Sequence, residues 1–178
     1  MPRHCQREII RRATERDAPA IASVHVNSWQ WAYRGLLPDA YLDNLSVADR
    51  ETMHADRLAD EGETRTWNVE RDGMVVGFAS TRPSRELDAL PEDAEVGAIY
   101  LLAAVAGTGI GDGLLDAATR DVAARGYKRI TLWVLETNTR ARRFYEKRGW
   151  TPDGTTKTET FGGVEVVEMR YQRIVDDR

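Results

Sequence analysis

The sequence has little cysteine, no long hydrophobic run and no internal repeat, and each absence narrows the classes of protein to consider. Its single cysteine, Cys5, cannot form an internal disulfide, which is typical of proteins in a reducing compartment. No apolar stretch approaches the ~20 residues that a transmembrane helix needs, and the charged N-terminus lacks the apolar core of a signal peptide. We therefore expect a cytoplasmic protein without membrane partners.

Positive charge is not in excess either, since the formal net charge is −4 at pH 7. This balance argues against a protein that binds nucleic acid through its phosphates. No set of Cys, His, Asp or Glu has the spacing of a metal site, so we expect no metal. The length of 178 residues predicts a single domain over 1–178, with a structured core of about 7–173 and no linker inside it.

Hydrophobic periodicity and turn residues predict a mixed α/β fold. Asp17 is suited to cap a helix, and Asp72-Gly73 and Gly162-Gly163 are suited to the turns of two hairpins. Residues 81–94 are polar, hold two prolines and indicate a loop. The expected strands are 7–14, 95–102 and 128–135, the hairpins 65–81 and 155–172, and the helices 18–29, 38–60 in two pieces, a segment from 110 that Gly126 ends, and 138–149.

The stretch "AGTGIGDGLL" places a glycine at every second position before an expected helix, at 107, 109, 111 and 113. Glycine in a helix costs roughly 1 kcal/mol relative to alanine, and close approach of backbone N–H groups to a phosphate would offset that cost. The run does not fit the dinucleotide pattern G-x-G-x-x-G, because Asp112 and Leu114 stand where the third glycine belongs, and no P-loop tripeptide follows it. A phosphate-binding helix start and a plain strand-to-helix turn both stay open.

A second motif, "NTRARRFYEKRGW" at 138–150, follows one strand later and carries Asn138, Ala141, Phe144, Tyr145, Gly149 and Trp150. Together with the glycine turn it resembles the GNAT superfamily of acetyl-CoA-dependent N-acetyltransferases. Ala106 stands where that family usually has Gln or Arg, which removes a side-chain contact but leaves the backbone donors of the turn. The resemblance implies a central, mostly antiparallel mixed sheet of about seven strands flanked by about four helices.

The resemblance also implies acetyl-CoA as the donor substrate. Its pyrophosphate would bind backbone N–H groups of the glycine turn, and its pantetheine arm would lie along the strand that enters the turn. Asn138 would contact this arm, although it is equally suited to be the N-cap of its helix. The implied cofactor-binding residues are Tyr100, Leu101, Gly107, Thr108, Gly109, Ile110, Gly111, Asp112, Gly113 and Asn138.

Two side chains are candidates for the proton transfers that acetylation of an amine needs. Tyr145, seven residues after Asn138 and on the same helical face, would protonate the thiolate, because a tyrosine hydroxyl with a pKa near 10 keeps its proton at pH 7. The alternative is that Tyr145 is only a core residue. Glu95, at the start of a strand, would take the proton of the acceptor, directly or through water; the alternative is a solvated strand-end charge. No cysteine lies near the motifs, so we expect direct transfer in a ternary complex.

The acceptor is an amine of a small molecule or a peptide, and its identity cannot be derived from the sequence. Trp29 and Tyr33, four residues apart, would share a helical face and could line the acceptor pocket, or they could simply pack on the sheet. His25 and His54 are interpreted as structural or exposed. A homodimer is common for such domains. The rival functions are a non-catalytic acyl-CoA-binding or sensing domain with the same fold, and a nucleotide-dependent oxidoreductase, which lacks its glycine pattern.

Overall fold

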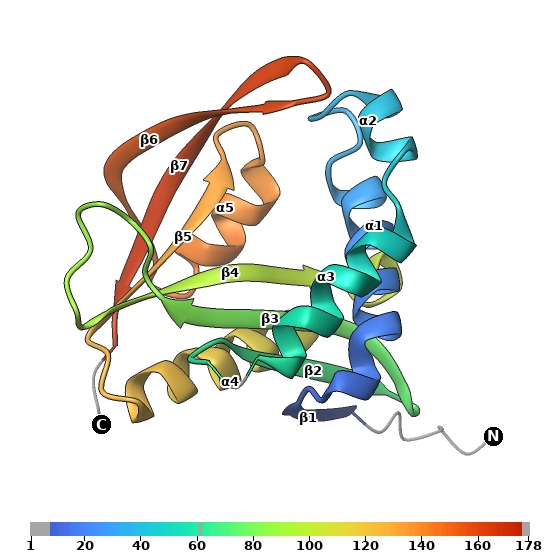
Figure 1. Ribbon diagram of the computed structural model, residues 1–178. Coiled ribbons are helices and arrows are strands. Elements are labelled where there is room, and N and C mark those ends of the chain that lie inside the picture. The colour runs from blue at the N-terminus through green and yellow to red at the C-terminus, as the bar shows by residue number, and fades with distance from the viewer. Residues whose placement is uncertain (1–7, 61, 176–178) are drawn as a thin grey trace.

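The computed structural model describes residues 8–60 and 62–175, which form one seven-stranded sheet with helices on both faces (Figure 1). Cys5 lies outside these residues. No helix in the described part of the chain is long and apolar enough to cross a membrane. The strands are β1 (Glu8–Arg12), β2 (Arg65–Arg71), β3 (Met74–Pro83), β4 (Asp93–Leu101), β5 (Arg129–Leu135), β6 (Thr151–Phe161) and β7 (Val164–Ile174). The helices are α1 (Ala18–Ala32), α2 (Asp39–Asp43), α3 (Val47–Ala59), α4 (Ile110–Ala124) and α5 (Thr139–Glu146), with 3-10 turns η1 (Glu15–Asp17) and η2 (Ala103–Val105).

The strand order is β1-β2-β3-β4-β5-β7-β6, and every neighbouring pair is antiparallel except β4 and β5. The prediction of a mostly antiparallel sheet of seven strands is therefore confirmed. The parallel pair is short, because it joins only Asp93, Ala94 and Glu95 to Arg129, Ile130 and Thr131. Beyond these residues β4 and β5 diverge, and Figure 1 shows the gap that opens between the two halves of the sheet.

The helices cover opposite faces of the first half of the sheet. Phe78 and Ala79 are adjacent on β3, so their side chains point to opposite faces. Phe78 packs with Ile21 and Val24 of α1, whereas Ala79 belongs to the cluster that contains Leu114 of α4. α5 packs on the second half, where its Tyr145 joins a cluster with β5 and β7. The apolar positions of these elements thus form a core on each side of the sheet.

The two hairpins form at the predicted turn dipeptides, Asp72-Gly73 and Gly162-Gly163. Asp72 and Gly73 have φ of 53° and 82°, the left-handed conformation that a two-residue hairpin turn requires. The second hairpin is longer than predicted, because β7 pairs with β5 along the whole of β5. Its tip rests on α2, where the Phe161 and Tyr41 rings are 5.5 Å apart (Figure 1). This hairpin therefore spans the gap between β5 and the helices of the first half.

Two local predictions need correction. The loop predicted over 81–94 is only 84–92, because β3 continues to Pro83 and β4 begins at Asp93, which Arg129 holds at 3.0 Å. Asp17 precedes α1 but does not cap it: its carboxylate turns back to accept the Thr14 N–H at 2.7 Å and pairs with Arg11. The segment 38–60 does form two helices, α2 and α3.

Candidate active site

The gap between β4 and β5 holds a cavity of about 530 Å³, which we call the larger cavity. One wall is β4 from Val96 to Leu101 and the other is β5 from Leu132 to Val134. The glycine turn and α5 line the rest of it. Parallel strands that separate in this way leave backbone groups unpaired along both walls, so the larger cavity can receive an extended polar chain.

The glycine turn meets the larger cavity at the start of α4. Gly107 and Gly109 have φ of 76° and 91°, which favours glycine at both positions. No side chain caps α4, so its first backbone N–H groups are directed at the cavity end and can bind an anion. Gly111 allows a close approach, since a Cβ there would lie 3.0 Å from Leu101 Cδ1 and 3.2 Å from Phe144 Cε2.

Most of the residues predicted to bind the cofactor line the larger cavity: Tyr100, Leu101, Gly107, Gly109, Gly111, Asp112 and Asn138. Three others of the turn are directed elsewhere. Thr108 donates its hydroxyl to the Val105 carbonyl at 2.7 Å, and the Ile110 side chain is in the core. A Cβ on Gly113 would meet Ile10 of β1 at 3.0 Å. These three can contribute at most their backbone groups.

Tyr145 and Asn138 both line the larger cavity, as their spacing on one helix predicts. The Asn138 side chain accepts the Ala141 N–H at 3.1 Å and so caps α5. Tyr145 is buried, with its ring 5.3 Å from Phe144 and 6.0 Å from Trp150. This burial raises the pKa of the Tyr145 hydroxyl above its ordinary value, so the hydroxyl is protonated at neutral pH and can act as a proton donor.

Basic side chains lie at the α5 end of the larger cavity. Arg140 covers the ring of Trp31 at 3.9 Å, and Arg148 covers the ring of Phe144 at 3.8 Å and pairs with Asp112. Both arginines line the cavity. This end of the cavity therefore combines backbone donors of the glycine turn with two guanidinium groups, which together favour a polyanionic ligand.

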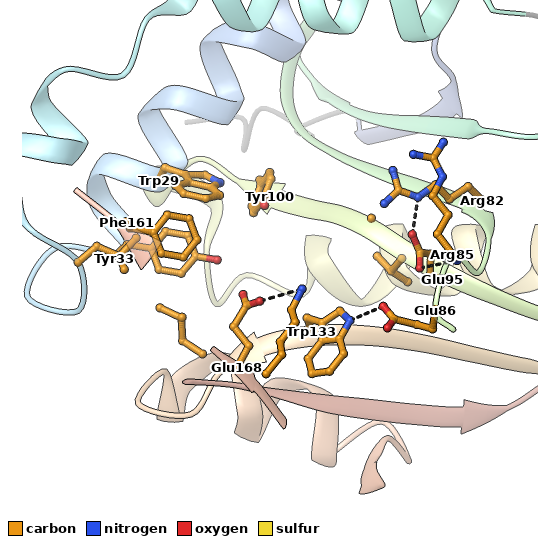
Figure 2. A pocket seen from close by; sticks show the side chains of 15 residues that line it. Trp29, Tyr33, Arg82, Arg85, Glu86, Glu95, Tyr100, Trp133, Phe161 and Glu168 are labelled. Atoms are coloured by element: carbon orange, nitrogen blue, oxygen red, sulfur yellow. Dashed lines mark hydrogen bonds and ion pairs between the residues drawn. The ribbon is translucent and has the colours of Figure 1, made fainter. Parts of the chain in front are cut away.

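A second cavity of about 270 Å³, which we call the smaller cavity, lies between β4, the β6–β7 hairpin and α1 (Figure 2). Aromatic rings of Trp29, Tyr33 and Phe161 form one end of it, and the charged groups of Arg82, Arg85 and Glu95 form the other. Trp29 lies 4.8 Å from Tyr33 and 5.9 Å from Phe161 between ring centroids. Trp29 and Tyr33 thus line a pocket, although they also pack together.

The two cavities meet at five residues that line both: Tyr33, Val96, Gly97, Tyr100 and Trp133. Gly97 is a β-bulge, because Ser80 pairs with Ala98 and Thr81 pairs with Val96. A bulge leaves the extra residue out of the ladder, so the backbone groups of Gly97 are available to a ligand at this junction. Sequence reasoning missed Gly97, and the signal was an isolated glycine inside an expected strand.

The smaller cavity contains three carboxylates, each with a different partner. Glu95, predicted from the sequence, pairs with Arg82 and accepts the Arg85 N–H at 3.2 Å. Glu86 accepts the Trp133 indole N–H at 2.7 Å. Glu168 of β7, which sequence reasoning missed, lies 3.3 Å from the Lys157 ammonium. Burial raises the pKa of Glu168, and Lys157 partly offsets this shift.

Behind the junction lies a pair of buried histidines. His25 Nδ1 and His54 Nε2 are 3.0 Å apart, and the His25 ring stacks on Tyr100 at 5.0 Å between centroids. Burial, with the charges of Arg50 and Arg57, lowers the pKa of His25 to about 3 and of His54 to about 4. The pair is therefore neutral at pH 7 and supports Tyr100, which agrees with the structural role expected from the sequence.

Comparison with known proteins identifies the family. The chain is 33% identical over 134 residues to an uncharacterized N-acetyltransferase of Bacillus subtilis, covering 72% of each chain. It is 29% identical over 166 residues to a probable N-acetyltransferase of Mycobacterium tuberculosis, covering 92% and 91%. The structure of PaiA N-acetyltransferase of Thermoplasma acidophilum, solved with coenzyme A, has the same fold, with a TM-score of 0.75 at 19% identity over 94% of this chain and 99% of that one. Residues 19–150 match the Acetyltransferase (GNAT) family, and the chain belongs to this family.

Proposed function

We propose that the protein transfers the acetyl group of acetyl-CoA to an amine by direct attack in a ternary complex. The observation that carries this proposal is that two cavities of different chemistry meet at Gly97. The larger has anion-binding groups at one end and an open strand edge along its wall, which suits a phosphorylated, extended donor. The smaller is lined by aromatic and charged side chains, which suits an amine acceptor.

The donor would occupy the larger cavity. The backbone N–H groups at the start of α4 are suited to its pyrophosphate. The β4 edge near Tyr100 and Leu101 is suited to the amide groups of its pantetheine arm, which can pair with a strand as another strand would. The thioester would then lie at the junction, where Gly97 offers backbone groups outside the ladder.

The transfer needs one new bond, one broken bond and three proton movements: the acceptor ammonium loses one proton before the attack, the same nitrogen loses a second as the amide forms, and the sulfur gains one. The neutral nitrogen of the acceptor attacks the thioester carbon, and the C–S bond then breaks as the carbonyl reforms. Tyr145 donates its hydroxyl proton to the leaving sulfur. The hydroxyl carries this proton before the reaction. Burial raises its pKa and makes it a weaker acid than a free tyrosine, so the proposed role rests on its place in the wall of the larger cavity.

The proton of the acceptor ammonium must be removed first, since an ammonium has no lone pair. Glu95 is our candidate base, directly or through water, because it lies two residues from Gly97 and lines the smaller cavity. Its carboxylate already receives Arg82 and the Arg85 N–H, so it can accept only through its remaining lone pairs. Glu168 is the competing carboxylate, and burial, by raising its pKa, makes it a stronger base than an ordinary glutamate.

Thermal unfolding with acetyl-CoA and a free-thiol assay over a panel of amines test the proposal. Acetyl-CoA at 100 times its Kd should add about 2.7 kcal/mol, a rise of about 5 °C or more in Tm, whereas NAD and ATP should not. Thiol release that depends on an added amine would support acetyl transfer. Binding without amine-dependent release by any amine, with Tyr145→Phe indistinguishable from wild type, would support an acyl-CoA sensor instead.

A further inference from the structure

Among the described residues, the smaller cavity is lined by one arginine that pairs with a carboxylate and by one that does not. Arg82 pairs with Glu95, but in the described part of the chain Arg85 enters no ion pair. Arg85 shares the same carboxylate only through its backbone N–H, at 3.2 Å. The guanidinium of Arg85 is therefore held at the cavity rim with its hydrogen-bond donors open to a ligand.

Two more arginines stand behind this pair on α3. Arg57 is exposed, yet desolvation of its guanidinium and the nearby charges of Arg82, Arg85 and Arg50 lower its pKa. No salt bridge is found for Arg50 or Arg57 among residues 8–60 and 62–175. The charges of Arg82, Arg85 and Arg50 thus act on Arg57, and like charges that lie together repel one another. An anion bound between Arg82 and Arg85 would relieve this repulsion.

The other charges of the cavity do not supply that anion. Lys157 lies 3.3 Å from Glu168 and 3.2 Å from Glu159, and its ammonium covers the ring of Trp133 at 4.6 Å. Glu86 is held by the Trp133 indole at 2.7 Å. These groups bring one ammonium against three carboxylates, so the floor is acidic and suits an ammonium. The arginines lie at the other charged part of the cavity, the Arg82–Arg85 end shown in Figure 2.

The arginine end is next to the junction of the two cavities. A Cβ placed on Gly97 would lie 3.5 Å from Arg82 Cζ and 3.6 Å from its Nη1. An anion on Arg82 therefore lies within a few ångströms of the residue at which the acetyl group would be transferred. A guanidinium so close to the acceptor also favours the neutral form of its amine, because like charges repel.

We propose that the acceptor is an amino-acid-like molecule, with an anionic group on the same carbon that bears the amine and with an apolar or aromatic substituent. The anion is received by Arg82 and Arg85, and the substituent is received by the opposite end, among Trp29, Tyr33 and Phe161. This inference rests on the proposed function, because it assigns the smaller cavity to the acceptor. Simple polyamines, which carry no anion, would leave the arginine pair unmatched.

Binding of two matched reaction products tests the inference without turnover. Isothermal titration calorimetry would compare N-acetyl-L-phenylalanine with N-acetylphenethylamine, which lacks only the carboxylate, on protein saturated with coenzyme A. We expect the acid to bind about tenfold more tightly or better, the effect of one charge-assisted hydrogen bond. In Arg85→Gln this ratio should fall toward one, and Arg85→Lys should restore part of it.

Arg16→Gln is the matched control, because Arg16 is exposed in η1 and its loss removes the same charge far from either cavity. This variant should keep the wild-type ratio. A ratio of one or less in wild type, an unchanged ratio in Arg85→Gln, or no binding of either product would overturn the inference. Acetyl transfer itself would be judged separately, by thiol release over an amine panel that includes L-phenylalanine, phenethylamine and spermidine.

Discussion

Lowering the pH from 7 to 5 should destabilise the protein through its buried histidine pair. Two ring nitrogens 3.0 Å apart share one proton, so the His25–His54 pair cannot hold two cations without losing its hydrogen bond. Both residues are buried, at 7% and 3% exposure, and their folded pKa values are about 3 and about 4. In the unfolded chain each histidine has a pKa near 6.5.

The sign follows from proton binding. Below pH 6.5 the unfolded chain binds more protons than the folded one, so the free energy of unfolding decreases as the pH is lowered. A pH of 5 lies about 1.5 units below the pKa of a histidine in the unfolded chain, and each unit corresponds to about 1.4 kcal/mol in the free energy of unfolding. The expected loss is about 2 kcal/mol for each histidine and about 4 kcal/mol for the pair. Asp17, whose pKa is lowered to about 2 by its hydrogen bonds with Arg11, contributes only below about pH 4, outside this window.

Urea unfolding at pH 7 and pH 5 measures this loss directly. His54→Gln keeps a polar group beside His25 but removes one titrating ring, so it should lose only about half as much stability as wild type over the same interval. A wild-type loss below about 1 kcal/mol, or an undiminished loss in His54→Gln, would refute the assignment of the neutral pair.

Three further predictions concern the catalytic and donor sites. Tyr145→Phe should lower kcat by about a hundredfold or more while the Kd of acetyl-CoA, measured by calorimetry, stays unchanged; an unchanged kcat would remove the hydroxyl from the reaction. Gly109→Ala should lower the free energy of unfolding by about 1–2 kcal/mol, because φ is 91° there, and it should raise the Kd of acetyl-CoA. Gly113→Ala places its methyl group against Ile10 and should leave that Kd unaltered. Equal effects of the two variants on the Kd would contradict the assignment of the turn. If Glu95 is the base, Glu95→Gln should abolish the rise of kcat/KM with pH, and Glu168→Gln should retain it. The reverse result would transfer the role to Glu168, because burial raises the pKa of that carboxyl group.

The local features of the fold were accessible from the sequence because short-range chemistry fixes them. The Asp72-Gly73 turn needs positive φ at both residues, and few residue types accept that conformation. The run of glycines from 107 to 113 likewise marked a turn in the sequence, and the structure shows that Gly109 in this turn has a positive φ. The motif that begins at Asn138 placed Tyr145 on the correct face, since seven residues span two helical turns.

Apart from Trp29, Tyr33 and Glu95, the walls of the smaller cavity were not accessible, because they come from distant segments. The histidine pair behind it was hidden for the same reason: His25 and His54 are 29 residues apart, and only the packing of α1 on α3 brings them together. Glu168 and Lys157 lie on paired strands of a hairpin whose turn was predicted, but the pattern did not indicate which face would line a cavity. The partner of Glu95, Arg82, was hidden in a segment interpreted as the start of a loop.

The brief contact between β4 and β5 also affects how the molecule meets other chains. An open sheet has two edges, here β1 and β6, but the divergence of β4 from β5 adds two more within the sheet. Unpaired strand edges are templates for pairing with other polypeptides. A donor bound along Val96–Leu101, as we propose, would cover one of these inner edges and would so keep the same backbone groups from pairing with another chain.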